Sequence, residues 1–375
     1  MSDRIKISPE TLVWATERGG YNTDSLFNIY PKALEWIKED SLPTVKQLER
    51  FAKKVHVPFG FLFLKKPPIE TIPVTFYRSN GDVVNNPPLV IKDLVNTIKY
   101  KQDWLRDFLI ESNYDELDFI GTLSDYKNIK ILEAANVIRK NLNIHLEWYR
   151  ETNKNAVFRY WIDTLENNRI FVISTGFVNN NKRIVDVDIC KGFTLIDKFC
   201  PFIYINTNNL GGGRIFTLLH ELVHVFVGNS VGLSYEPIHP SSTPLEKFCD
   251  EVASEILLPT EHFVQTWHSL EGNFYDRFTK IANVNHISKL VVMRKALDCG
   301  FIQIADFWSS YNSYTSVPYT KSTGGNYWNS KPYEVSRKFY SFVDQALKQG
   351  KILPTNAYKL TNMKGKTYEN FKKKS

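Results

Sequence analysis

Two histidines and a glutamate stand at a spacing that suits metal chemistry. Residues 219–224 read Leu-His-Glu-Leu-Val-His, which places His220 and His224 four residues apart, with Glu221 beside the first. Side chains four residues apart on an α-helix share one face, so both imidazoles can reach one ion. Neutral imidazole nitrogens are zinc ligands, and a neighbouring carboxylate can take a proton from the water that zinc binds. The motif predicts a Zn²⁺ site with Glu221 as its general base.

The helix that carries this motif is expected to be buried. It extends over residues 214–227 and, outside the motif, consists mostly of leucine, isoleucine, valine and phenylalanine. Burying two imidazoles and a carboxylate in such surroundings costs free energy unless they are paired or bind an ion. A metal site is therefore favoured over the alternative, a histidine and glutamate cluster that satisfies its own hydrogen bonds inside a core.

A zinc site needs a third protein ligand, and the next predicted helix offers one. Glu246 lies 22 residues after the second histidine, and Asp250 follows four residues later on the same face. We expect Glu246 to bind the metal and Asp250 to accept a hydrogen bond from a ligand histidine, which fixes its tautomer. Glu251 and Glu255 project from the opposite side of this helix. The alternative role of Glu246 is a capping box with Thr243 at the helix start.

The elements that position these residues combine helices with a small sheet. Helices are expected over residues 90–112, 126–142, 145–166, 214–227 and 243–258, and strands over residues 170–173, 184–189 and 202–206. The last strand comes shortly before the motif helix, across a glycine-rich loop. An extended peptide could add to the edge of that strand through main-chain hydrogen bonds, whereas an interior strand would have no free edge. Both arrangements remain open at this point.

The first 66 residues are predicted to form a separate helical region. Short helices are expected to begin at Pro9, Thr23, Lys32 and Thr44, a number compatible with a helix-turn-helix domain. Prolines at positions 67, 68 and 73 interrupt this pattern, and residues 79–88 have the composition of a linker. We therefore place a domain boundary near residue 68.

The composition indicates a globular protein and argues against a membrane-spanning or disulfide-rich one. With 375 residues, 43% of them hydrophobic and 23% charged, the chain can bury a core, and no apolar run approaches the roughly 18 residues of a membrane span. Four scattered cysteines do not form a disulfide framework, so we expect a cytoplasmic protein without membrane contact. The net charge of +7 resides in residues 345–375, where eight lysines face one acid. A solvated tail is the favoured interpretation of this charge, with loose attraction to phosphate as the alternative.

Three stretches read PFIYIN (201–206), RIFTLLHELVH (214–224) and EKFCDEVASEILLP (246–259). Together they resemble the ImmA/IrrE family of zinc metallopeptidases. By position, the resemblance implies that His220, His224 and Glu246 bind zinc and that Glu221 is the general base. It extends over roughly residues 165–371, because the later segments are similar to the C-terminal extension of longer family members. The N-terminal region resembles the Xre-type helix-turn-helix that is often fused to such peptidases, which implies DNA as a partner, with protein contact or dimerisation as the alternative.

We therefore expect an α+β fold in which a zincin-like metallopeptidase core combines a small sheet with the H-E-x-x-H helix. The expected domains are a helix-turn-helix domain, a helical connecting region, the peptidase domain and a helical C-terminal extension with a basic tail, at residues 1–68, 69–165, 166–305 and 306–375.

The predicted function is that of a zinc metalloendopeptidase. The resemblance implies that its substrate is a regulatory protein, such as a repressor of a mobile element or stress operon. Two rivals remain open. One is a DNA-binding transcription regulator in which the metal site is structural or sensory. The other is a toxin–antitoxin or phage-defence component that acts by binding a partner through residues 90–166.

Overall fold

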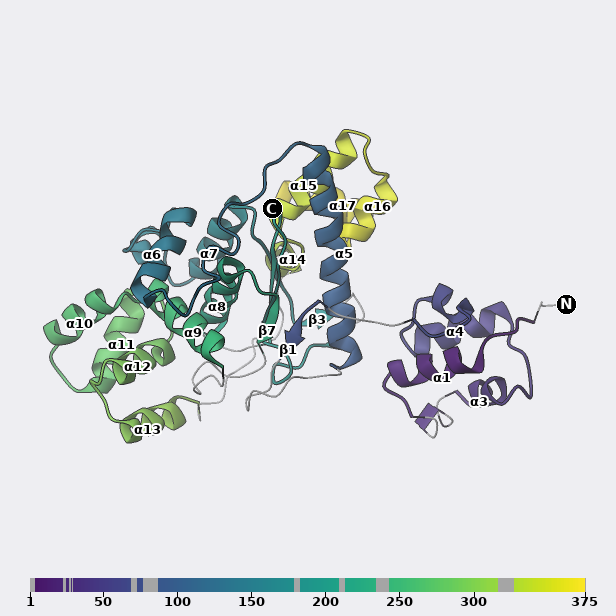
Figure 1. Cartoon of the computed structure of the whole chain (residues 1–375), viewed down its shortest axis with the longest axis horizontal. Coiled ribbons are helices and arrows are strands. Elements are labelled where there is room, and N and C mark those ends of the chain that lie inside the picture. The colour runs from purple at the N-terminus through teal and green to yellow at the C-terminus, as the bar shows by residue number, and fades with distance from the viewer. Residues whose placement is uncertain are drawn as a thin grey trace. The chain divides into compact units, whose positions relative to one another are not determined.

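The computed structural model describes residues 4–22, 25–26, 28, 30–68, 73–76, 87–178, 183–208, 213–233, 243–315 and 327–374. The protein has an α+β fold, which confirms the predicted class (Figure 1). It divides into two compact units, one made of Met1–Ile72 and Asn86–Asp93, the other of Pro73–Asn85 and Leu94–Ser375. The linker predicted at 79–88 lies largely outside the described residues. The larger unit contains every residue of the predicted metal site.

The smaller unit is helical. Its elements are α1 (Pro9–Arg18), α3 (Lys32–Ile37), α4 (Val45–Lys54) and the 3-10 helix η1 (Phe59–Phe63). Helix α4 begins with a capping box, in which Thr44 N–H donates to Gln47 Oε1 and Gln47 N–H donates to Thr44 Oγ1, over 2.8 and 3.4 Å. Trp36 and Phe51 meet edge to face in its core. The helix expected to begin at Thr23 lies partly outside the described residues, and the helix-turn-helix assignment stays a prediction.

The larger unit contains most of the helices. They are α5 (Leu89–Glu111, of which Leu89–Asp93 belong to the smaller unit), α6 (Ile131–Leu142), η2 (Trp148–Glu151), α7 (Val157–Asn167), α8 (Gly213–Val227), α9 (Pro244–Leu257), α10 (Thr260–Ser269), α11 (Phe274–Val284), α12 (Lys289–Asp298), α13 (Ile304–Thr315), α14 (Tyr327–Val335), α15 (Arg337–Lys348), α16 (Pro354–Thr361) and α17 (Lys366–Lys374). Within the described part of the chain, no helix combines the length and apolar character that crossing a membrane requires.

A five-stranded sheet forms the centre of the larger unit. Its strands are β1 (Thr75–Phe76), β2 (Phe171–Ser174), β5 (Gly192–Leu195), β6 (Phe202–Ile205) and β7 (Val231–Leu233), in the spatial order β1-β7-β5-β6-β2. Strands β2 and β6 run parallel, whereas β5 is antiparallel to both β6 and β7. A separate hairpin joins β3 (Phe177–Val178) to β4 (Arg183–Ile184).

Alternate residues of the central strands point into two different cores. Val172 and Ile203 are paired across β2 and β6 and join the large core that includes α7 and α8. Phe171 and Phe202, one residue earlier in each strand, stack on each other and meet phenylalanines of α15 on the opposite face. Because both faces are covered, these strands are continuous apolar runs rather than alternating ones.

Two details of the predicted elements are corrected by the structure, and one open alternative is decided. The helix expected over residues 145–166 is two elements, η2 and α7, separated at residues 152–156. The strand expected over residues 184–189 ends at Ile184, and the chain turns before the unpredicted strand β5. The strand at 202–206 is β6, which lies between β5 and β2, so it has no free edge for a peptide. Its neighbours on both sides already use its main-chain hydrogen bonds.

Candidate metal centre

The predicted site residues come from two helices that pack side by side, α8 and α9 (Figure 1). Helix α8 is buried along its length from Ile215 to Val227 and contacts β5 and β6, as its apolar sequence requires. Thr243 caps the N-terminus of helix α9, and its hydroxyl accepts a hydrogen bond from Glu246 N–H over 3.3 Å. This cap satisfies an N–H group that has no partner inside the helix.

The C-terminal end of α9 is held by neighbouring elements. Arg139 of α6 donates to the Glu255 carbonyl over 2.6 Å, and the Trp148 indole donates to the Leu257 carbonyl over 3.3 Å. These bonds satisfy carbonyl groups that a helix end leaves without partners. The Glu255 side chain pairs with Lys295 of α12 at 2.7 Å. It therefore lies away from the predicted metal ligands, as its position on the helix indicates.

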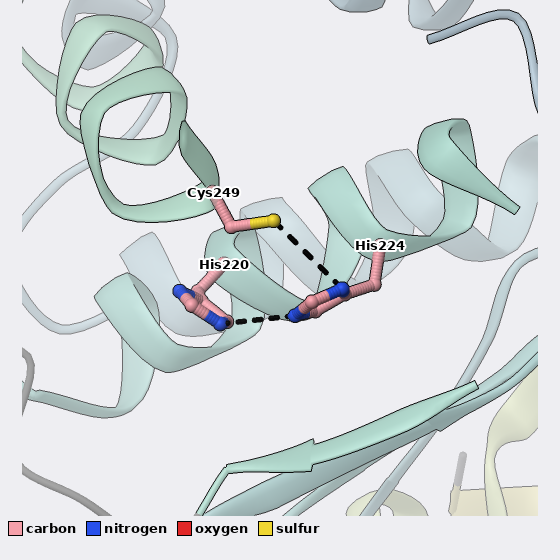
Figure 2. A group of neighbouring side chains, drawn as sticks. All are labelled: His220, His224 and Cys249. Atoms are coloured by element: carbon pink, nitrogen blue, oxygen red, sulfur yellow. Dashed lines mark hydrogen bonds between the residues drawn. The ribbon is translucent and has the colours of Figure 1, made fainter. Parts of the chain in front are cut away.

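Three potential metal ligands converge between the two helices. His220 Nε2 lies 3.1 Å from His224 Nε2 and 3.0 Å from Glu246 Oε2, and His224 Nε2 lies 3.5 Å from Glu246 Oε1. Figure 2 shows the two imidazoles turned toward each other on successive turns of α8. The three residues are buried, with at most 2% of their surface exposed.

These distances fit a tetrahedral ion. Zinc binds nitrogen and oxygen at about 2.0–2.2 Å, so ligand atoms of a tetrahedral site lie roughly 3.3 Å apart. The two imidazole nitrogens lie 3.1 Å apart, and each lies close to a different oxygen of Glu246, His220 Nε2 at 3.0 Å from Oε2 and His224 Nε2 at 3.5 Å from Oε1, so all three separations are near that value. The donor set, two imidazole nitrogens and one carboxylate, is also that of catalytic zinc sites. The types and separations of the residues present therefore fit a zinc ion.

The other ring nitrogens of the histidines contact further groups. His220 Nδ1 lies 2.8 Å from Asp250 Oδ1, so the ring donates to the carboxylate from Nδ1. That tautomer leaves the Nε2 lone pair directed at His224 and Glu246. His224 Nδ1 lies 3.7 Å from the Cys249 thiol, as the dashed line in Figure 2 marks. The contacts that orient both rings are therefore made by Nδ1, on the side of each ring opposite the Nε2 atom that faces Glu246.

Cys249 is the rival third ligand. Its sulfur lies within 4.8 Å of potential ligand atoms of His220 and His224, and the three residues form a buried cluster. The thiol, however, contacts Nδ1 of His224, whereas the two histidines face each other through Nε2. The two ring nitrogens of an imidazole direct their lone pairs away from each other, so an ion on the Nε2 side does not face the thiol. Glu246 is the ligand that this geometry favours.

Glu221 is held beside this centre by a residue that sequence patterns missed. Thr194 of β5 lies with its hydroxyl 2.7 Å from Glu221 Oε2 and 3.0 Å from the Glu221 carbonyl. The second carboxylate oxygen, Oε1, is buried and has no hydrogen-bond partner in the described part of the chain. Thr194 was missed together with its strand, although the Phe-Thr-Leu run at 193–195 is rich in strand-forming residues.

Gly192, two residues before Thr194, lets the strand approach α8 closely. A Cβ atom at this position would lie 2.9 Å from Thr217 Cγ2, 3.0 Å from the Tyr204 carbonyl oxygen and 3.1 Å from Glu221 Oε1. Only glycine fits here without a shift of its neighbours. The glycine therefore sets the separation between β5 and the helix that carries Glu221.

Burial and charge set the protonation of the cluster. Burial raises the pKa of Glu221 to about 7, against the opposing effect of His224 and His220. Burial raises the pKa of Glu246 less than the two histidines lower it, so its pKa falls well below the usual range. For His220, burial is outweighed by Asp250 and Glu246, which raise its pKa well above the usual value. The carboxylates thus favour a positive charge at the point where the two histidine Nε2 atoms and the Glu246 carboxylate meet.

Comparison with known proteins identifies the part of the chain that holds this centre. Residues 167–295 match the family model of the IrrE N-terminal-like domain, an M78 peptidase family. Residues 335–374 match a domain of unknown function, DUF8813. No curated protein and no solved structure matches the chain. The first match includes α8 and α9 and supports an ImmA/IrrE-type metallopeptidase.

Proposed function

We propose that the protein is a cytoplasmic zinc endopeptidase of the ImmA/IrrE type that hydrolyses a peptide bond in a regulatory protein. The observation that carries this proposal is the convergence of His220 Nε2, His224 Nε2 and Glu246 at 3.0–3.5 Å, with the Glu221 carboxylate near enough for the charges of both histidines to act on it. Three protein ligands leave the fourth position of a tetrahedral ion for water or substrate, as catalytic zinc sites do. The proposed core is zincin-like.

Each residue has a defined part in the proposed reaction. His220, His224 and Glu246 would hold the ion, which when bound polarises the scissile carbonyl and lowers the pKa of water. Glu221 takes a proton from the attacking water and passes it to the leaving amine, so the carboxylate is regenerated in each cycle. Asp250 holds the tautomer of His220.

The hydrogen bonds of Glu221 support its role as the base. The Thr194 hydroxyl lies within hydrogen-bond distance of both Oε2 and the main-chain carbonyl of Glu221, and donating its one hydrogen to Oε2, the nearer oxygen, limits rotation of the carboxylate. Oε1 has no hydrogen-bond partner in the described residues, so one oxygen is available for the proton. A positioned carboxylate of this kind contributes by proximity as well as basicity.

Burial of the site favours a second candidate function. His220 and Glu221 are 0% exposed, so the site as described is closed to a polypeptide. A closed centre of this kind also suits a metal that stabilises or senses in a DNA-binding regulator, with the smaller unit as an Xre-type helix-turn-helix, or in a toxin–antitoxin or phage-defence component. In that case the base is dispensable and the ligands are not.

Two measurements on the same variants separate these functions. Zinc content is determined by mass spectrometry for wild type, Glu221→Gln, His220→Ala and Glu246→Ala. New protein N-termini are then mapped in cells that express each variant, with Glu251→Gln as the control because Glu251 is a half-exposed glutamate of α9 that pairs with Lys247.

The peptidase proposal expects about one zinc per chain in wild type and Glu221→Gln, and loss of zinc in the two ligand variants. It also expects new N-termini with wild type and Glu251→Gln but not with Glu221→Gln. Identical cleavage by wild type and Glu221→Gln overturns the role of the base. Zinc binding with no Glu221-dependent cleavage, together with a biological activity that needs only the ligands, supports the regulator instead.

A further inference from the structure

A second concave site lies in the larger unit, formed by α5, β2, β3 and the C-terminal helices α14 and α16. Its volume is about 810 Å³, which is within the range of small-molecule sites. None of the residues that line it belongs to the metal centre. In Figure 1, α5 lies beside the C-terminal helices, and ring contacts such as that of Trp104 with Phe339 join α5 to α15.

Lys101 of α5 lines this cavity, and its ammonium group forms no ion pair within the described part of the chain. The residue is 6% exposed, and its Nζ atom lies 5.7 Å from the centre of the Phe339 ring. It forms no hydrogen bond and no ion pair with any residue that the structure describes. A buried ammonium group without an ion pair is costly, because it loses its hydration and a more distant carboxylate compensates only part of that loss.

A second buried lysine adds to the positive charge. Lys331 of α14 is 2% exposed and pairs with Glu334 at 3.1 Å. Lys359 and Lys364 also line the cavity and are exposed at its opening. Four lysines therefore face one carboxylate among the described lining residues. An anion placed between the two buried lysines would gain two charge-assisted hydrogen bonds.

The pKa of Lys101 agrees with this excess of positive charge. Burial, followed by the neighbouring Lys331 ammonium, lowers the pKa of Lys101 to about 8, and Glu334 opposes the shift. Lysine pKa values fall in this way when no anion compensates the lost hydration. A bound anion would supply an opposite charge next to Lys101 and would thereby remove the cause of this lowered pKa.

The rest of the cavity wall suits an apolar or aromatic group. Ile98 of α5, Ile173 of β2 and Val335 of α14 supply aliphatic surface, and Phe177 and Tyr358 supply aromatic rings. Small-molecule sites commonly join such apolar walls to a few charged groups that fix orientation. A bare inorganic ion would use only the lysines and leave most of the cavity unfilled.

We propose that this cavity binds a small molecule that carries phosphate groups on an apolar or aromatic body, with Lys101 and Lys331 as its buried anion contacts. Nucleotides and nucleotide-like cofactors have this chemistry and approximately this size. The site is separate from the metal centre, and its existence does not depend on the proposed peptidase activity.

Calorimetric titration of the full chain tests the proposal, with ATP, NADP⁺ and coenzyme A as probes and inorganic triphosphate and adenosine as fragments. The variants are Lys101→Met, which keeps the length of the side chain without its charge, and Lys127→Met as control. Lys127 is an exposed lysine of the same unit that does not line the cavity. Thermal unfolding verifies that each variant is folded, and Lys101→Met is expected to be at least as stable as wild type because it removes a buried charge.

At least one of the three probes is expected to bind wild type and Lys127→Met equally, more tightly than either fragment, and Lys101→Met at least tenfold more weakly. Equal affinity of wild type and Lys101→Met overturns the proposal and assigns any binding to surface lysines such as those of the C-terminal tail. Triphosphate binding as tight as that of the best probe overturns the role of the apolar wall. No binding of any probe to wild type at millimolar concentration overturns the site itself.

Discussion

Removal of the Asp250 carboxylate tests how the metal centre is oriented. In the structure Asp250 Oδ1 accepts a hydrogen bond from His220 Nδ1 over 2.8 Å, and its side chain is only 15% exposed. A hydrogen bond to a charged group contributes about 1.5–3 kcal/mol, equivalent to roughly 10–150-fold in an equilibrium constant. Changes to such outer contacts of metal ligands typically weaken metal binding by about 10–100-fold. Asp250→Ala should therefore raise the Kd for zinc about 10–100-fold.

The size of the effect should follow the charge of the acceptor. Asp250→Asn retains an oxygen that can accept the same hydrogen bond, but a neutral acceptor binds about half as strongly, so we expect a loss of about tenfold or less. Glu251→Ala is the matched control, because it removes the adjacent carboxylate of α9, whose side chain is 44% exposed and pairs with Lys247 at 3.7 Å. A surface pair of this kind contributes little.

Competition with a chromophoric zinc chelator measures the three affinities, and circular dichroism verifies that the variants are folded. The reasoning is refuted if Asp250→Ala binds zinc within about threefold of wild type while His220→Ala loses it, because the contact to His220 would then be irrelevant to the metal. It is also refuted if Glu251→Ala loses as much affinity as Asp250→Ala, since the effect would then be one of helix charge.

Two further predictions concern folding. Glu166 of α7 is 4% exposed, and burial raises its pKa from 4.5 to about 7, so the folded state holds this proton more tightly than the unfolded chain. Its contribution to stability is thus complete below pH 4.5 and declines as the pH rises through 7, by on the order of 3 kcal/mol. Denaturant unfolding should show that Glu166→Gln gains stability relative to wild type between pH 5 and pH 8, and a difference that does not vary with pH contradicts the assignment. Gly192→Ala should lower the free energy of unfolding by about 1–3 kcal/mol, because its Cβ would lie 2.9 Å from Thr217 Cγ2; an unchanged denaturation midpoint would show that β5 and α8 separate freely.

Local patterns in the sequence predicted the two helices of the metal centre. The apolar residues of α8 and the Thr243-Pro244 start of α9 are signals that span a few positions, and they give helices at Gly213–Val227 and Pro244–Leu257. Helical periodicity also places His220 beside His224 and Glu246 beside Asp250 on their own helices. Their roles as ligands and as outer contact remain predictions that the metal measurements test.

Other features depend on contacts between distant segments, which no local pattern encodes. The strand β5 has only four residues and is fixed by pairing with β6 and β7, so neither it nor Thr194 was predicted. The interior position of β6 depends on the order of five strands drawn from residues 75 to 233. Lys101 shows the same limit, because its helix is evident from sequence, but only the packing of α14 and α16 around it buries the ammonium group without an ion pair to any described residue. The sequence determined which helices could carry ligands, because helical periodicity is a local property. Only the tertiary structure decided which groups lie beside those ligands, because burial and charge depend on segments far apart in the chain.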